Sequence, residues 1–513
     1  MPPAVHVADA AVVILAAAAL WIAFLGGNRY LIFGVVVSLR SPLLAMYAAG
    51  SILIVRHLLW PRPTILQRLI AARRSLHGHA DLAAAVRAFV ATRPAVLLVG
   101  FLAVVTFGTT NPGFQLSKDP LANLPVRFDA GWYGDIALKG YSWDHTFQRQ
   151  RNIAFFPALP MMMRPVGAVF GMYDPTVPYD RRMLRGLWAG VAISLGAFLW
   201  ALVYIVRLGR ALVGEEAAGN AALLLAAYPF ALFFSAPYTE SLYLLSAAGA
   251  FYHFGRGEWK ASAAWGLLLG LTRPNGCFAS VPLAILGAQQ ILKCARVPEC
   301  QGARSATETG LRARDSGSGT RDSGTETVAS AFRRKGNPGF DLKAVGWKPI
   351  AVRLVTAAMP GIGMLLFTAY LYDFTGVWFA WARSHEAWGR NYQGLAPFVT
   401  AFGWVRDEPF VQVIAGVPYS ALNTMGVLFA LALTYPVFRR LGLAWGVFVL
   451  INLVPPLFAG GVLSMGRLTS TLFPIFFALA LLIRPVALPA WVAGFAVAQG
   501  FCAALFFTWR QLF

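Results

Sequence analysis

The chain has few charged residues for its length. Asp, Glu, Lys and Arg make up only 13% of its 513 positions, whereas hydrophobic residues make up 58%. Soluble globular proteins contain about 25% charged residues, so this composition excludes an ordinary soluble domain. Apolar runs that approach the roughly 17–25 residues of one bilayer crossing recur along the whole chain. The composition therefore predicts an all-α polytopic membrane protein with about 11–13 transmembrane helices.

Acidic residues are scarcer still, with 22 Asp and Glu against 43 Lys and Arg and a formal net charge of +21. Such an excess is typical of nucleic-acid-binding proteins, but here the basic residues gather in loops between apolar runs. Residues 56–93 contain seven Arg and one acid, and residues 293–348 contain eleven Lys or Arg and six acids. Because basic loops stay in the cytoplasm, both segments are predicted to be cytoplasmic. The expected partners of these charges are anionic membrane lipids, and no nucleic acid is expected.

The sequence also lacks the patterns of several common sites. Zinc fingers, phosphate-binding glycine loops, heptads and fixed-period repeats are all missing from it. The cysteines have no metal-ligand spacing and are expected to have no functional role; they are Cys277, Cys294, Cys300 and Cys502. A divalent metal is suggested only by the adjacent pairs Asp144–His145 and His385–Glu386, which are poor ligand sets without a third residue nearby. The first apolar run has no cleavage site after it and is expected to be a retained span, not a signal peptide.

Apolar runs and charged loops divide the chain into four parts. Residues 1–93 contain two spans and a basic cytoplasmic loop, and residues 94–292 form a membrane core with an extracytoplasmic loop at residues 111–182. Residues 293–349 form a second basic cytoplasmic loop. Residues 350–513 form a C-terminal transmembrane bundle with an outer loop at residues 374–410. Residues 301–330 are rich in Ser, Gly and Thr and are predicted to be disordered. The apolar residues 155–170 are expected to lie on the membrane or to dip into it as short interfacial helices.

Two carboxylates stand among aromatic residues and glycines in residues 127–141, whose sequence is RFDAGWYGDIALKGY. Acids beside membrane spans are energetically costly and are by default candidates for function. Asp129 and Asp135 flank Trp132 and Tyr133. This grouping predicts a carbohydrate surface, because sugars stack on aromatic rings and hydrogen-bond to carboxylates. A carboxylate beside an acceptor hydroxyl can act as a general base, an effect worth about 10²–10⁴ in rate.

Three more charged residues interrupt apolar segments. Glu240 lies in SAPYTESLY (residues 235–243), Arg273 in LTRPNG (residues 271–276) and Arg467 in MGRLTSTLFP (residues 465–474). The guanidinium fork matches phosphate oxygens, so arginines near the membrane surface predict an anionic ligand. The expected topology brings these residues to the same side of the membrane as Asp129, Asp135, His385 and Glu386.

Each of these residues also has a plainer interpretation. The two acids can be solvated or can pair with Arg127 or Lys139. Glu240 can belong to a helix cap, and Arg273 can pair with Glu240 or snorkel to the interface. These alternatives stay open on the sequence alone.

Several of these motifs resemble a known family. RFDAGWYGDIALKGY followed by NIAFFPALP (residues 152–160) resembles the signature of the PIG-V-like family, named after GPI mannosyltransferase II, within the GT-C superfamily of membrane glycosyltransferases. PYTESLY (residues 237–243) and TRPNG (residues 272–276) are similar to two further family blocks. The four blocks follow the family's order over residues 127–276. One position departs from the pattern, because Phe128 stands where the family usually has Trp.

The resemblance implies a GT-C-like bundle that transfers a sugar, expected to be mannose, from a polyprenyl-phosphate donor to a glycolipid or glycan acceptor. The reaction would run on the extracytoplasmic face, with inversion and without a cofactor. Asp129 matches the superfamily's loop aspartate, which is taken to be the general base, and Arg273 and Arg467 would balance the departing lipid phosphate. The remaining candidates for substrate binding are Trp132, Tyr133, Asp135, Asn152, Glu240, Asn275, His385 and Glu386.

The alternative function is a transporter or flippase of a lipid-linked glycan. Transporters bind their substrates near the bilayer midplane, between two related halves. In this sequence the polar groups gather at one predicted surface and no half is repeated, which favours the transferase. The Ala-, Arg- and Gly-rich composition is typical of bacteria, so we expect a multi-pass protein of the cell inner membrane whose site faces the periplasm. Because bacteria do not make GPI, a GPI acceptor is not expected.

Overall fold

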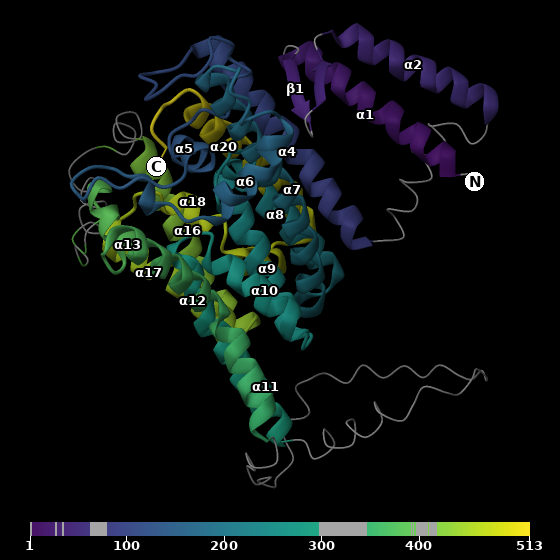
Figure 1. The fold of residues 1–513 in the computed structure, drawn as a ribbon. Helices are drawn as coiled ribbons and strands as arrows, with labels where there is room; N and C mark the ends of the chain where they lie inside the picture. The colour runs from purple at the N-terminus through teal and green to yellow at the C-terminus, as the bar shows by residue number, and fades with distance from the viewer. Residues whose placement is uncertain are drawn as a thin grey trace, which may run out of the picture.

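The computed structural model describes residues 3–25, 28–32, 35–39, 41–61, 80–296, 346–390, 392, 394, 396, 409 and 418–512. These residues form a bundle of helices, as Figure 1 shows. A two-stranded antiparallel hairpin is also present; β1 (Asn28–Ile32) pairs with β2 (Val35–Leu39), with Asn28 opposite Leu39. The predicted all-α polytopic membrane fold is confirmed. The segment predicted to be disordered, residues 301–330, and most of the outer loop after residue 390 lie outside the described residues.

Eight helices among the described residues are long and apolar enough to cross a bilayer. A ninth crossing results if α8 (Glu215–Ala227) and η2 (Pro229–Ser235), which are bent by 80° at Tyr228, count as one span. The eight comprise α2 (Pro42–Leu59), α4 (Ala80–Phe107), α7 (Tyr179–Val213), η3 (Pro274–Ala279) with α11 (Ser280–Arg296), α12 (Trp347–Thr375), α16 (Pro418–Arg440), α17 (Leu443–Gly460), and η8 (Pro485–Ala487) with α20 (Leu488–Phe507).

This number is lower than the 11–13 spans predicted from apolar length. Several apolar runs form helices that are too short to cross, namely α9 (Glu240–Gly255), α10 (Trp259–Gly270) and α19 (Phe473–Leu482), with 16, 12 and 10 residues. At about 1.5 Å per residue, each is shorter than the roughly 30 Å hydrocarbon core. The sequence indicates turns near Glu240 and at LTRPNG (residues 271–276), but the estimate of 11–13 spans counts the short apolar segments beside these turns as crossings.

The first outer loop folds into short helices, as predicted. α5 (Ala130–Lys139), η1 (Asn152–Ala154) and α6 (Ala158–Val169) follow one another between α4 and α7. Both α5 and α6 pack against α7. In Figure 1, α5 lies beside α20 at one end of the bundle, so the first outer loop and the C-terminal end of the chain are neighbours.

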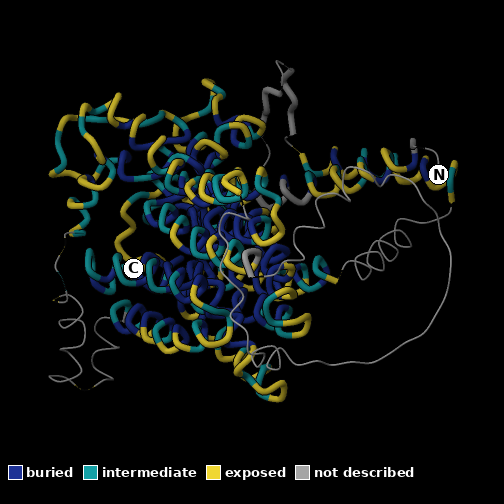
Figure 2. The backbone as a smooth tube through the Cα atoms, turned by 90° about the horizontal axis from the view of Figure 1, so that it is seen from below, coloured by how far each residue is buried: buried dark blue, intermediate teal, exposed yellow. Residues whose placement is uncertain are grey.

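Buried residues lie at the centre of the bundle, and exposed residues lie towards its periphery (Figure 2). Arg93 is buried on α4 and donates hydrogen bonds to the carbonyls of Ala226 and Ala231, at 2.6 and 2.5 Å. Those carbonyls lie on either side of the break between α8 and η2. Since backbone groups freed by a helix break need partners inside a membrane, Arg93 stabilises the broken span.

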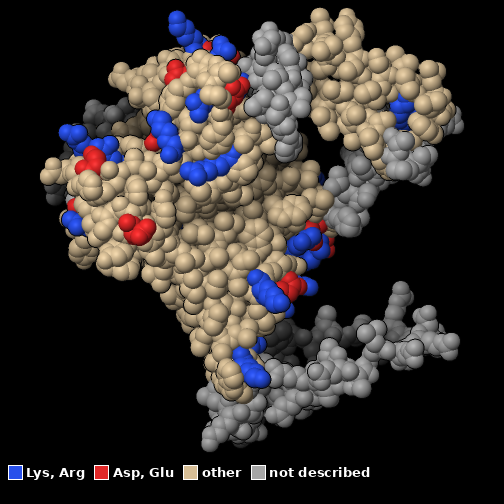
Figure 3. All heavy atoms as spheres, in the orientation of Figure 1, with Lys and Arg blue, Asp and Glu red and all other residues tan. Residues whose placement is uncertain are grey.

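Charged side chains lie at the ends of the bundle, with a broad uncharged surface between them in Figure 3. Asp81, at the start of α4, pairs with Arg207 at 3.4 Å and with Arg210 at 2.7 Å near the end of α7. The ion pairs show that the start of α4 and the end of α7 share one end of the bundle. α1 (Pro3–Leu25) and α2 pack on each other at the side of the bundle, joined by an ion pair of 2.7 Å between Asp9 and Arg56 (Figure 1).

α10 crosses α12 at a contact made by glycines. A Cβ atom added to Gly270 would lie 1.9 Å from the carbonyl oxygen of Pro360, and one added to Gly363 would lie 2.3 Å from that of Leu267. Small residues allow two helix backbones to approach closely within a membrane. This crossing fixes the end of α10, three residues before Arg273.

We expect Gly270→Ala to destabilise the protein, because the methyl group would meet backbone atoms of α12 that cannot move aside. Overpacking of this kind costs about 1–3 kcal/mol. The melting temperature of the purified protein in detergent should fall by several degrees. Gly255→Ala on α9 is the matched control, since a Cβ atom there meets nothing within 4 Å. Equal melting temperatures for both variants would contradict a close crossing at Gly270.

Candidate functional site

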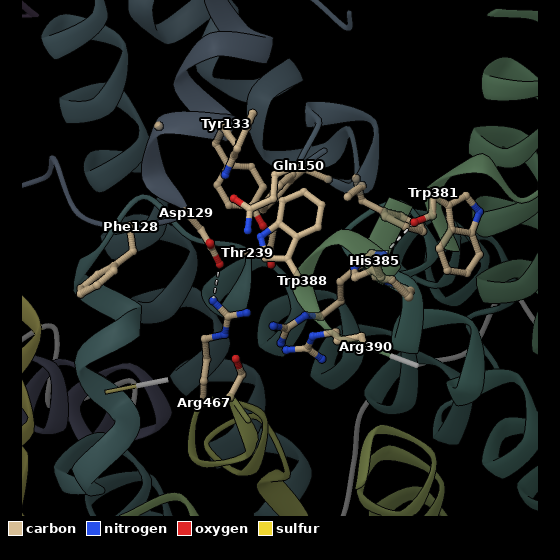
Figure 4. Close-up of a pocket in the computed structure, with 18 of the residues that line it drawn as sticks. Phe128, Asp129, Tyr133, Gln150, Thr239, Trp381, His385, Trp388, Arg390 and Arg467 are labelled. Carbon is tan, nitrogen blue, oxygen red and sulfur yellow. Dashed lines mark hydrogen bonds and ion pairs between the residues drawn. The ribbon is translucent and has the colours of Figure 1, made fainter. Parts of the chain in front are cut away.

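A cavity of about 1010 Å³ lies where the short helices and the broken spans converge. Its lining comes from α5, the turn before η3, the segment after α12, the end of α17 and the residues that follow α20. Figure 4 shows Asp129, Tyr133, Gln150, Thr239, His385, Trp388, Arg390 and Arg467 around it. Residues 129 and 467 are therefore neighbours, although 338 positions separate them in the chain.

Asp129 stands at the N-terminal end of α5 and points into the cavity towards Arg467 (Figure 4). Its backbone N–H donates a hydrogen bond to the hydroxyl of Tyr238 at 3.1 Å. Its carboxylate accepts a hydrogen bond from Nη1 of Arg467 at 2.9 Å, and the side chain stays 21% exposed. The carboxylate is thus held in place and remains open to a ligand.

Four charged residues form a chain of alternating sign from the cavity into the protein. Nε of Arg467 lies 3.2 Å from Oε1 of Glu240, the same oxygen that accepts a hydrogen bond from Nη2 of Arg273 at 2.6 Å. Glu240 is fully buried and Arg273 is 7% exposed. An isolated charge at this depth would be very unfavourable, so each member depends on its neighbours. The order is Asp129, Arg467, Glu240, Arg273.

The charge state of Arg467 follows from these contacts. Burial alone would lower the pKa of its guanidinium, but the carboxylates of Glu240 and Asp129 outweigh burial and raise that pKa above the ordinary value. Opposite charges at short range always favour the ionised forms. Arg467 is therefore a permanent cation between two acids.

Arg390 is a third arginine on the cavity wall. Unlike Arg273 and Arg467, it has no ion pair with an acid of the described part of the chain. Burial, together with the nearby charge of Arg467, lowers the pKa of Arg390 to about 10, so it still carries its charge at neutral pH. Among the described residues, three arginines thus face Asp129 and Glu240, while Asp135 on the same lining is paired with Lys139, which leaves an excess of one positive charge.

His385 is neutral in this cavity. Its Nδ1–H donates to the carbonyl of Trp381 at 2.7 Å, which leaves Nε2 as an acceptor. Burial lowers the pKa of His385 from 6.5 to about 4, and the positive charge of Arg390 acts in the same direction. The residue can therefore accept a hydrogen bond from a ligand without adding a charge.

Aromatic rings form one wall of the cavity. Trp132 stacks on Phe155 with ring centroids 5.8 Å apart, and Trp388 packs edge-on against both at 6.0 and 5.7 Å. Burial, strengthened by Glu240, raises the pKa of Tyr133, so its hydroxyl stays protonated. Such a wall suits the apolar face of a sugar ring.

Asp135 and Asn152 have structural contacts. Asp135 lies 3.2 Å from Nζ of Lys139 and accepts a hydrogen bond from the amide of Asn152, also at 3.2 Å. Asn152 is buried, donates to the carbonyl of Gly140 and accepts from the N–H of Ser142. The plainer interpretation of Asp135, a pair with Lys139, matches this geometry, although Asp135 also reaches the cavity lining.

The remaining sequence candidates divide between the cavity and the surface. Asn275 lines the cavity and donates to Oδ1 of Asn452 at 2.9 Å, an oxygen that also accepts from the hydroxyl of Tyr243. Glu386 is exposed and lies outside the cavity that the described residues form. In the described part of the chain, no three His, Cys, Asp or Glu residues are grouped to hold a metal ion.

Sequence reasoning missed several residues of the cavity. Arg390, Trp381 and Trp388 belong to WFAWARSHEAWGR (residues 378–390), a segment in which only His385 and Glu386 were singled out. The only sequence signal for Arg390 was its position in an outer loop rich in aromatic residues. Arginines that anchor a protein at the membrane interface have the same surroundings, so this signal did not indicate a site. Trp509 gave no signal, because it follows the last helix of the chain and nothing local links it to Asp129.

The comparisons with known proteins agree with the motifs. Residues 111–297 match a family model described as Mannosyltransferase (PIG-V). This confirms the resemblance predicted from the four motifs, which all lie within the matched residues. The match contains Asp129, Glu240 and Arg273 and ends before Arg467. No match was found among the curated proteins.

Solved structures of an oligosaccharyltransferase from Archaeoglobus fulgidus are distantly similar. A complex with zinc and sulfate has 14% sequence identity and a TM-score of 0.36, with 80% of this chain and 53% of that chain covered. An archaeal oligosaccharyltransferase AglB from the same organism, in complex with an inhibitory peptide and a dolichol-phosphate, has 13% identity and a TM-score of 0.33, with 82% of this chain and 56% of that chain covered. The present chain thus spans about half the length of these structures.

We expect stability to depend on His385 below neutral pH. Because the folded-state pKa is about 4 and the ordinary value is 6.5, only the unfolded chain binds a proton here as the pH falls below 6.5. The contribution of the neutral His385 to the free energy of unfolding is therefore complete above pH 6.5, and it is lost progressively as the pH falls towards 4. Melting temperatures of the wild type should fall more between pH 7.5 and pH 5 than those of His385→Asn. An equal fall in both proteins would contradict a buried neutral histidine.

Proposed function

We propose that this chain is a GT-C-type membrane glycosyltransferase. It transfers a hexose, mannose by the family resemblance, from a polyprenyl-phosphate donor to a hydroxyl group of a glycolipid or glycan acceptor. The observation that carries this proposal is the position of Asp129, a partly exposed carboxylate within the matched residues that faces a cavity lined with arginines and aromatic rings.

The proposed reaction is a single displacement at C1 of the sugar. Asp129 takes the proton of the acceptor hydroxyl while the hydroxyl oxygen attacks C1. The bond between C1 and the phosphate oxygen breaks, and its electron pair leaves with polyprenyl phosphate. A single attack from the opposite face inverts the configuration at C1. A single displacement needs only one general base. This agrees with the cavity, because the second carboxylate, Glu240, is buried behind Arg467.

The leaving phosphate gains negative charge in this step, and the excess positive charge of the cavity stabilises it. Arg390 is the best candidate to contact the phosphate, since Arg273 and Arg467 are already paired with acids. The resemblance implies that arginines such as Arg273 and Arg467 balance the phosphate, and the proposal adds Arg390 to them. Arg273 and Arg467 hold the acids in place and add to the positive potential.

We further propose that the cavity faces the extracytoplasmic side. Met183, near the start of α7, lines the cavity, whereas Arg207 and Arg210 near its other end pair with Asp81. α7 has 35 residues, about 50 Å at 1.5 Å per residue, so its two ends lie on opposite sides of the bilayer. The basic segments at residues 56–93 and 293–348 favour the cytoplasm for the end near Asp81.

Asp129→Asn should abolish sugar transfer, because an amide cannot accept the proton of the acceptor. We expect a loss of at least about 10²-fold in turnover with unchanged expression, since Arg467 keeps its ion pair with Glu240. The assay follows polyprenyl-phosphate hexoses and membrane-lipid acceptors in reconstituted vesicles, with mass spectrometry of the products.

Asp174→Asn is the matched control, because Asp174 lies in the same outer loop and only bonds locally to Thr176. Turnover by Asp129→Asn at the wild-type rate would remove Asp129 from the role of base. Movement of the donor lipid across the bilayer without sugar transfer would favour the flippase instead.

Arg390→Gln should raise the KM for the donor and also lower turnover at saturating donor, because the lost guanidinium contacts a phosphate that gains charge as it leaves. Loss of one charged hydrogen bond of about 1.5–3 kcal/mol corresponds to a rise in donor KM of roughly 10- to 100-fold. Arg383→Gln is the control, since Arg383 is exposed and lies over the ring of Phe147 instead of in the cavity. An unchanged KM for Arg390→Gln would show that the phosphate is bound elsewhere.

A further inference from the structure

Two aromatic residues with left-handed backbones pack against each other on the cavity wall. Phe128 has φ = 43° and Trp509 has φ = 61°. Their ring centroids are 4.6 Å apart, and both residues line the cavity. A left-handed conformation is unfavourable for a bulky side chain and persists only where its surroundings enforce it. The contact between the two rings joins both strained positions.

A hydrogen bond also links the same turn to the end of α20. Arg127 is buried, and its Nε donates to the carbonyl oxygen of Phe507 at 2.7 Å. Phe507 is the last residue of α20, where carbonyls have no partner inside the helix and need an external donor. Phe128 also contacts the ring of Phe506, with centroids 5.7 Å apart. Two successive residues of the loop, 127 and 128, are thus attached to the C-terminal end of the chain.

The attached residues come directly before Asp129. The hydroxyl of Tyr238 donates to the carbonyl of Arg127 and accepts from the N–H of Asp129, both at 3.1 Å, which closes the turn on its inner side. Figure 4 shows Phe128 pointing away from Arg467 and Asp129 pointing towards it. The left-handed backbone at Phe128 is part of the turn that leads into Asp129.

We propose that Trp509 is a positioning residue for Asp129. Its ring holds Phe128 in the left-handed conformation, and that conformation aims the carboxylate of Asp129 at the reacting hydroxyl. The proposal rests on the proposed function of Asp129 as the base. It gives the C-terminal end of the chain, far outside residues 111–297, a part in catalysis without contact with the reacting atoms.

The test compares Trp509→Ala with Trp509→Phe in vesicles, with polyprenyl-phosphate mannose as the donor. Trp509→Ala should lower kcat about tenfold or more, because a displacement of about 1 Å at a reacting group costs up to about 10²-fold. The KM for the donor and the Kd for polyprenyl phosphate should stay within twofold, since the arginines are untouched. Trp509→Phe keeps a ring against Phe128 and should recover most of the lost turnover.

Trp491→Ala on α20 is the matched control, because Trp491 packs on Phe495 and does not line the cavity. Its kcat should equal that of the wild type. An unchanged kcat in Trp509→Ala would overturn the proposal, and so would a parallel rise in donor KM or a failure of Trp509→Phe to recover turnover. If the wild type transfers sugar and Asp129→Asn does not, such a result removes this inference alone. If Asp129→Asn is active, the role of Asp129 and that of Trp509 fall together.

Discussion

The site depends on the ion pairs that link Asp129, Arg467, Glu240 and Arg273. None of these charges could be buried at this depth alone, because the desolvation cost of an unpaired ion exceeds what the fold can supply. Alternating signs solve this problem, and one end of the chain of charges, Asp129, remains open to the cavity. The rest of the architecture can be understood as the means of bringing these four side chains together.

Each of the four charges enters the site from a break in a helix or from the end of one. Glu240 begins α9 after the bent pair α8 and η2, and Arg273 lies between α10 and η3. Arg467 lies on α18 (Met465–Thr469), a single turn between α17 and α19. Broken helices inside a membrane are tolerated where the freed backbone is buried in protein or lines a cavity. The short apolar helices that lower the number of full spans are therefore a consequence of building the site.

Sequence motifs predicted much of the site because charged residues, which are unfavourable inside a membrane, stand out in an apolar chain. Asp129, Glu240, Arg273 and Arg467 were each singled out by their charge, and the structure places them within ion-pair distance. The pair between Arg273 and Glu240 was one of the alternatives left open by the sequence. The contacts of Arg467 with Glu240 and Asp129 were not predicted, because they depend on how each helix breaks. Arg390 escaped notice, since an arginine among aromatic residues is common at any membrane interface, and only the folded cavity distinguishes it.

The central claim is that the alternating ion pairs hold one carboxylate beside an anion site. A cryo-EM structure of the protein with polyprenyl phosphate tests this claim most directly. The account predicts the phosphate against Arg390, with Asp129 still bonded to Arg467 and its other oxygen open to an acceptor hydroxyl. A phosphate bound outside this cavity, or one that displaces Asp129 from Arg467, would contradict it.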